Sequence, residues 1–175
     1  RGDRADDKLR HADVNPNRAG VAAIAPVAAD LTDLETGINT GALRAVVFLG
    51  HDLPISETAL RRLRELDCVI ALASHERGPV KAAQIALPIA AWAETHGSVT
   101  NVDGRLQRMH GAIAAPGQAV PGWEAVARLA HAVSPAAKVT WANAREVWKD
   151  MTTAVKPWTG TPWGREVRPQ SLRFA

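Results

Sequence analysis

The stretch Leu43-Arg-Ala-Val-Val-Phe-Leu-Gly50 is the clearest structural signal in this sequence. It is short, apolar and rich in β-branched residues, and it stops at a glycine, which is typical of a strand buried in a parallel sheet. Asp67-Cys-Val-Ile-Ala-Leu-Ala-Ser74 repeats the pattern, and Gln84-Ile-Ala-Leu-Pro88 is a third, shorter example. The sequence therefore predicts three strands that follow one another closely along the chain.

The segments between these strands are predicted to be helical. Ser56-Glu57-Thr58 begins the first helix, which places arginines opposite an apolar stripe formed by Leu60, Leu63 and Leu66. Residues 79–83 predict one or two further helical turns. Strand, helix, strand, short helix, strand indicates an α/β fold of the Rossmann or flavodoxin type, with an open parallel sheet and right-handed crossovers.

Ligands of such sheets bind beyond the carboxyl ends of the strands. In this chain the corresponding loops begin at Gly50, Ser74 and Pro88. A binding site, if this segment forms one, is therefore expected along that edge of the sheet.

The amino-terminal part of the chain reads as a lead-in to this domain. Residues 1–20 are polar and contain Asn15-Pro16-Asn17, which predicts an extended segment ending at a turn. Residues 21–133 would form the α/β domain. Within it, Asp30 or Thr32 could cap a further helix before the first strand.

The carboxyl-terminal part predicts two helices and a tail. The first helix covers residues 123–133, and the second covers residues 141–155 within a terminal region 134–175. The Pro- and Trp-rich tail from residue 156 should run extended over a surface, because prolines interrupt helices and strands. Tryptophans in the last third of the chain would either anchor this tail or face a partner subunit: Trp123, Trp141, Trp148, Trp158 and Trp163.

Composition limits the classes of function. With 21 basic and 18 acidic residues, the net charge is only +3 and no extended basic patch indicates nucleic-acid binding. A single cysteine, Cys68, excludes an internal disulfide or a multi-cysteine cluster, and its apolar surroundings predict a buried strand residue. No apolar run approaches the roughly 18 residues that a membrane span needs.

Polar residues after the predicted strands are weak candidates for chemistry. Ser74-His75-Glu76 has the residue types of a catalytic triad, but adjacent side chains point in different directions. His51 and His75 both follow strands and could hold a metal ion with Asp52, Glu76 and Glu94, or they could be solvated loop residues. We expect no catalytic residues and no resident metal in this segment.

The stretch Gly97-Ser-Val-Thr-Asn-Val-Asp-Gly-Arg-Leu-Gln107 interleaves glycines with polar side chains. Glycines let a backbone approach a ligand closely, and the polar groups could hold a planar heterocycle or a phosphate. The same pattern also fits a tight structural hairpin between Val99 and Met109. Both interpretations stay open on the residues alone, although no glycine-rich phosphate-binding turn follows any predicted strand.

The segment from Lys81 to Gln107 resembles the molybdopterin oxidoreductase family. Members read approximately Thr-Ala-x-x-Ala-Asp-x-x-Leu-Pro, followed by Glu-x-x-Gly-Thr-x-x-Asn-x-Glu-Gly-Arg-x-Gln. Asn15-Pro-Asn-Arg-Ala-Gly20, Val46–Gly50 and Pro121-Gly-Trp-Glu124 are similar to further family segments, so the resemblance covers roughly residues 12–133. The positions that correspond to the main motif are Lys81 to Pro88, Glu94, Gly97, Ser98, Asn101, Asp103, Gly104, Arg105 and Gln107.

This resemblance implies one of two kinds of protein. Formate dehydrogenases and nitrate reductases of the family bind a molybdopterin guanine dinucleotide. The large iron–sulfur subunit of NADH:quinone oxidoreductase (complex I) keeps the fold and generally holds no molybdenum. A β-barrel domain follows this region in the cofactor-binding enzymes, whereas here a helix and a tail follow Val133, and Trp163 to Phe174 resembles complex I termini.

The complex I resemblance implies a non-catalytic structural role with no cofactor in this segment. Iron–sulfur clusters would lie in the upstream part of the parent subunit, and other peripheral-arm subunits would be the partners, on the cytoplasmic side of the inner membrane. The alternative is a fragment of a formate dehydrogenase-like enzyme. In that case the loop would contact molybdopterin through Thr100, Asn101, Gly104, Arg105 and Gln107. In the complex I case the same five residues would be a remnant of that site.

The sequence departs from the family at two places. Gly78-Pro79 stands where a threonine is common, and Gln84 stands where aspartate is usual. Both are expected to face the cofactor position, so these departures argue against molybdopterin binding.

Overall fold

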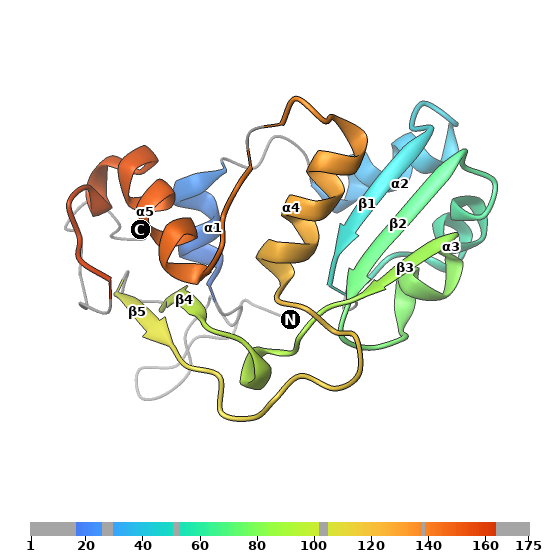
Figure 1. The fold of residues 1–175 in the computed structure, drawn as a ribbon. Coiled ribbons are helices and arrows are strands. Elements are labelled where there is room, and N and C mark those ends of the chain that lie inside the picture. Colours follow the sequence, from blue (N-terminus) through green and yellow to red (C-terminus); the bar gives the residue numbers. More distant parts are fainter. Residues whose placement is uncertain (1–16, 26–29, 51–52, 102–104, 138, 164–175) are drawn as a thin grey trace, which may run out of the picture. The chain divides into compact units, whose positions relative to one another are not determined.

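The computed structural model describes residues 17–25, 30–50, 53–101, 105–137 and 139–163. Over these ranges the chain divides into two compact units (Figure 1). The sheet unit comprises residues 28–95 and 111–140, and the hairpin unit comprises residues 1–27, 96–110 and 141–175. Each unit combines several separate stretches of chain, so the two units do not test the domain boundaries expected at residues 20 and 133. Those boundaries stay predictions.

The sheet unit contains three parallel strands, which confirms the predicted fold class. β1 (Ala45–Leu49), β2 (Cys68–Ala73) and β3 (Ile85–Pro88) lie in the order β1-β2-β3. Val47 lies opposite Ile70, and Ile70 lies opposite Ile85. The apolar, β-branched composition of the strands explains this arrangement, because a parallel sheet buries side chains on both faces.

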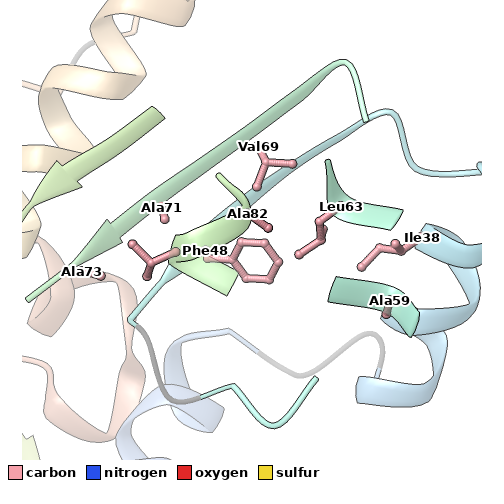
Figure 2. Packing of buried hydrophobic residues seen from close by; sticks show 9 residues of the cluster. Ile38, Phe48, Ala59, Leu63, Val69, Ala71, Ala73 and Ala82 are labelled. Carbon is pink, nitrogen blue, oxygen red and sulfur yellow. The ribbon is translucent and has the colours of Figure 1, made fainter. Parts of the chain in front are cut away.

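One face of this sheet is covered by α2 (Leu31–Asn39), α3 (Glu57–Leu63) and the short 3-10 helix η1 (Gly78–Ala82). Figure 2 shows the Phe48 ring near the centre of the buried cluster, with Leu63 on one side and Ala71 on the other. The cluster is built largely from alanine, valine and leucine, so its density depends on close approach of small side chains.

Capping residues set the starts of these helices. The Asp30 carboxylate accepts a hydrogen bond from the Asp33 N–H at 2.9 Å, and the Asp33 carboxylate accepts one from the Asp30 N–H at 3.0 Å. This reciprocal pair satisfies two N–H groups that a helix start leaves free, and it confirms the Asp30 cap. Ser56 caps α3 with a single bond, since its hydroxyl accepts a hydrogen bond from the Ala59 N–H.

The opposite face carries α4 (Gly122–Val133), and α3 and α4 lie on opposite sides of the strands (Figure 1). Ala125 of α4 packs with Ile70 and Leu72 of β2. The segment before α4 runs parallel to the chain just beyond β3, where the Ala90 N–H donates to the Val120 carbonyl at 2.8 Å. The 3-10 turn η2 (Trp92–Glu94) follows shortly after the end of β3.

The hairpin unit is built from α1 (Arg18–Ile24), β4 (Gly97–Thr100), β5 (Leu106–Met109), α5 (Ala144–Ala154) and the 3-10 turn η3 (Lys156–Trp158). Its core contains Leu106, Trp148, Val155 and Trp158.

Two expectations of extended chain are wrong in the hairpin unit. Residues 18–20 form the first turn of α1 rather than an extended lead-in, because a left-handed Asn17 (φ 62°) turns the chain into the helix. The tail begins with η3, whose Trp158 is buried in the core, rather than running extended. The other expectations about the lead-in and the tail concern residues 1–16 and 164–175, which lie outside the described residues.

Candidate functional site

β4 and β5, on either side of the predicted binding loop, pair antiparallel as a hairpin requires, and residues 102–104 between them lie outside the described residues. Thr100 of β4 pairs with Leu106 of β5. Next to this pair, the Asn101 N–H donates to the Arg105 carbonyl at 3.0 Å, and the Arg105 N–H donates to the Asn101 side-chain oxygen at 2.8 Å. Asn101 therefore closes the hairpin with both its backbone and its side chain.

Thr100 connects the hairpin to α1. Its N–H donates to the Asn17 side-chain oxygen at 2.9 Å, and its side chain is buried. Gly20 of α1 lies directly against it, because a Cβ atom there would be 2.8 Å from the Thr100 hydroxyl oxygen. The hydroxyl oxygen has no hydrogen-bond partner among the described residues, yet it lies beneath a helix rather than on an open surface.

Gly20→Ala is expected to destabilise this contact by about 1–3 kcal/mol, the usual cost of adding a methyl group to a closely packed site. The new Cβ would also lie 2.5 Å from the Asn17 side-chain oxygen, which cannot move without losing its bond to Thr100. Urea unfolding and hydrogen exchange of the β4 amides would measure the effect.

Gly97→Ala is the matched control for this substitution. A Cβ at Gly97 meets only the Met109 methyl carbon, at an ordinary 3.8 Å. Equal stability of the two variants would contradict the assigned role of Gly20.

The structure thus brings together four of the five residues implied by the family resemblance. Arg105 and Gln107 are half-buried on the hairpin beside Thr100 and Asn101, and Gly104 lies outside the described residues. The Thr100 N–H and the Asn101 side-chain oxygen are engaged within the hairpin unit, whereas the buried Thr100 hydroxyl has no hydrogen-bond partner among the described residues. The cofactor-binding role of the five residues as a set stays a prediction.

Asn101→Ala is expected to loosen the hairpin by about 1 kcal/mol, a typical value for one hydrogen bond. Asn101→Asp keeps an acceptor oxygen in the same place and should restore most of the loss. The measurement is the exchange rate of the Arg105 amide hydrogen by NMR. An Arg105 amide equally protected in wild type and Asn101→Ala would contradict the assigned bond.

Beside the hairpin, three tryptophans fix the start of the tail. The Trp148 indole N–H donates to the Thr161 carbonyl at 2.9 Å, and the Trp148 and Trp163 rings meet edge to face at 5.3 Å. The Arg108 guanidinium lies 4.5 Å from the Trp163 ring centre, a cation–π contact that sequence patterns did not indicate. Trp148, Trp158 and Trp163 therefore serve as anchors for this segment.

In the sheet unit, an open pocket of about 440 Å³ lies at the carboxyl ends of β2 and β3. Ser74, His75, Glu76 and Lys81 supply its polar groups, while small apolar side chains such as Ala73 form its base. The Ser74 hydroxyl oxygen lies 3.0 Å from His75 Nδ1, but all three residues of the Ser-His-Glu sequence are exposed loop residues.

The described residues contain no group of three His, Cys, Asp or Glu side chains placed to hold a metal ion. His51 and Asp52, which the sequence suggested as partners of His75, lie outside the described residues. Within the described part of the chain, no helix is long and apolar enough to cross a membrane.

The expectation that Gln84 faces the cofactor position is wrong. Its side-chain oxygen accepts a hydrogen bond from the Val69 N–H at 2.6 Å, and its amide nitrogen donates to the Leu66 carbonyl at 3.1 Å. Both partners lie at the amino end of β2, opposite the edge where parallel sheets bind ligands. Gln84 therefore joins the α3–β2 connection to β3, away from the ligand edge of the sheet.

Gly78-Pro79 does follow the carboxyl end of β2, as expected. Gly78 has a φ of 50°, which favours glycine, and Pro79 is fully buried at the start of η1. A dinucleotide pyrophosphate is usually held by backbone N–H groups at a helix start. Pro79 has no N–H group, so this turn offers one backbone donor fewer at the ligand edge of the sheet.

The sequence profile of the molybdopterin oxidoreductase family matches residues 17–132, which include the sheet, the hairpin and α4. This chain belongs to the molybdopterin oxidoreductase family.

Individual relatives agree with this assignment. The chain is 31% identical over 105 residues to F420-dependent formate dehydrogenase 2 subunit alpha from Methanococcus maripaludis, covering 60% of this chain and 16% of that protein. It is 30% identical over 104 residues to NADPH-Fe(3+) oxidoreductase subunit alpha from Geobacter sulfurreducens, covering 57% of this chain and 12% of that protein. The chain thus spans a small part of each relative's length.

A solved structure has the same fold. Acetylene hydratase from Pelobacter acetylenicus superposes with a TM-score of 0.60 at 18% identity, covering 82% of this chain and 22% of that protein.

Proposed function

We propose that this chain is a structural, non-catalytic portion of the large iron–sulfur subunit of a respiratory NADH:quinone oxidoreductase. In this role it supports the cluster-bearing domain and the neighbouring peripheral-arm subunits on the cytoplasmic side of the inner membrane. The iron–sulfur clusters would be held by the upstream part of the same subunit, since this chain has a single cysteine.

The observation that carries this proposal is which partners the polar groups of the hairpin residues contact. The Asn101 side-chain oxygen is occupied by the Arg105 N–H, and Thr100 is buried beneath Gly20. In a cofactor site the Asn101 side-chain oxygen would be directed at the ligand, whereas here it closes the hairpin, and the Thr100 N–H binds the Asn17 side chain at the start of α1. Pro79 at the start of η1 supports the same conclusion, because it removes an N–H group from the sheet edge.

Metal and pterin analysis of the complete protein tests this proposal. We expect iron and acid-labile sulfide, without molybdenum, tungsten or an oxidised pterin product. Copurification with peripheral-arm subunits and NADH:quinone reductase activity of the assembly are the second expected result. Stoichiometric molybdenum with a pterin would overturn the proposal, as would a purified protein that associates with no other subunit.

The second candidate function is a portion of a true molybdopterin-dependent oxidoreductase. The similarity to a formate dehydrogenase subunit favours it. In that case Arg105→Ala should lower the pterin content of the complete protein. Pterin content that is zero in wild type and variant alike would exclude this second candidate.

A further inference from the structure

Two histidines lie side by side at the open end of the hairpin formed by β4 and β5. The outermost pair of the two strands is Gly97 with Met109. His96 and His110 are the next residues outward, one on each side of the hairpin. Their ring centroids are 6.0 Å apart, and the ring planes are nearly perpendicular, at 87°. Both side chains are exposed, so solutes can reach the pair.

The backbone is held in place on both sides of this pair. Inward, the antiparallel register of β4 and β5 fixes the distance between the two chain segments. Outward, Gly111 lies close to the preceding segment, because a Cβ atom there would be 3.3 Å from the Glu94 carbonyl carbon. The next residue, Ala112, donates its N–H to the Ala93 carbonyl at 2.7 Å. The separation of the two histidine backbones is therefore set, and only the side chains need to rotate for both rings to reach one ligand.

Two neighbouring imidazoles suit a transition-metal ion. Zn²⁺, Ni²⁺ and Cu²⁺ bind ring nitrogens, whereas the hard ion Mg²⁺ prefers oxygen ligands. Each nitrogen lies about 2 Å from a bound zinc ion, so the ring centres of two imidazoles on one ion are about 5 Å apart. The observed 6.0 Å differs from this by a small rotation of exposed side chains, which is a fast motion. Coordination takes one nitrogen of each ring and leaves the other for a hydrogen bond.

We propose that His96 and His110 form a two-histidine chelate for a divalent transition-metal ion such as Zn²⁺. The described part of the chain places no third His, Cys, Asp or Glu side chain with the pair, so water completes the coordination and the ion is exchangeable. Affinity comes from the chelate, because binding of the second ring is intramolecular once the first is bound. The ion clamps the hairpin at residues 96 and 110, where the chain enters and leaves this part of the hairpin unit. The inference holds for either candidate function.

Histidine footprinting of the complete protein tests the proposal. Diethylpyrocarbonate modifies accessible imidazoles, and mass spectrometry measures the modification rate at each histidine. With Zn²⁺ well above its dissociation constant, we expect the rates at His96 and His110 to fall at least about tenfold, by mass action. Mg²⁺ should have no effect. His131, an exposed histidine near the end of α4, is the internal control and should react equally fast with and without Zn²⁺. Unchanged rates at the pair in Zn²⁺ would overturn the proposal.

Single variants distinguish one shared site from two independent ones. In a chelate, loss of either ring weakens Zn²⁺ binding at the other by at least about tenfold. His110 should therefore lose its protection in His96→Ala, and His96 should lose it in His110→Ala. His131→Ala is the matched control and should leave the protection of both histidines unchanged. Protection of the remaining histidine that persists in either single variant would contradict a shared ion. Pterin found in the complete protein would overturn the proposed function and leave this inference standing.

Discussion

Trp158→Ala is expected to lower the free energy of unfolding of the hairpin unit by about 3–5 kcal/mol, as large aromatic truncations in cores do. Trp158 is fully buried and packs in one cluster with Leu106, Trp148 and Val155. Removing the indole leaves a cavity among side chains that come from β5, α5 and η3, and these elements are too constrained to collapse into it completely. Denaturant unfolding followed by circular dichroism, with hydrogen exchange of the β5 amides, measures the loss.

Two further substitutions sharpen this prediction. Trp158→Phe keeps a buried ring and removes an indole N–H that has no hydrogen-bond partner among the described residues, so its cost should be clearly smaller than that of alanine. Trp92→Ala removes an exposed tryptophan and should change stability by no more than about 0.5 kcal/mol. The assigned role of Trp158 would be refuted if Trp158→Ala were as stable as Trp92→Ala.

Phe48→Ala is expected to cost about 3–5 kcal/mol in the sheet unit for the same physical reason. Its ring fills the space between β2, α2 and α3, where most of the neighbouring side chains are small (Figure 2). Alanine and valine neighbours cannot extend into the space that the ring leaves. Denaturant unfolding of this chain, with hydrogen exchange of the β2 amides, provides the measurement.

Leu49→Ala is the matched control, since Leu49 is the next residue of the same strand and is largely exposed. In this chain its effect should stay below about 1 kcal/mol, as is usual for surface positions. If Phe48→Ala and Leu49→Ala were equally mild in this chain, the assignment of Phe48 to the core would be contradicted.

Local sequence patterns predicted much of the sheet unit. The apolar run ending at Gly50 became β1, Asp30 became the cap of α2, and Ser56 became the cap of α3. These features depend on residues only a few positions apart, so their signals are present in short windows of sequence. The turn-rich stretch after Gly97 likewise predicted a hairpin for local reasons.

The roles of the candidate-site residues could not be predicted from short stretches of sequence, because they depend on contacts between residues far apart in the chain. The bond from the Thr100 N–H to the Asn17 side chain joins residues 83 positions apart, and Gly20 shields the Thr100 hydroxyl from the α1 side. The Gln84 side chain appeared to belong to the ligand edge because of its place in the family motif, whereas its partners lie at the amino end of β2. Neither contact has a signal in local periodicity.

By itself the sequence determined the fold class, the strand positions and the family, because hydrophobic periodicity, helix caps and an ordered motif are properties of neighbouring residues. Only the tertiary structure decided how the motif residues are used. It buried Thr100, engaged Asn101 in the hairpin and left Val47 and Leu49 open on β1. The physical reason is that burial and hydrogen-bond partners are set by segments distant in the chain, which no short window of sequence contains.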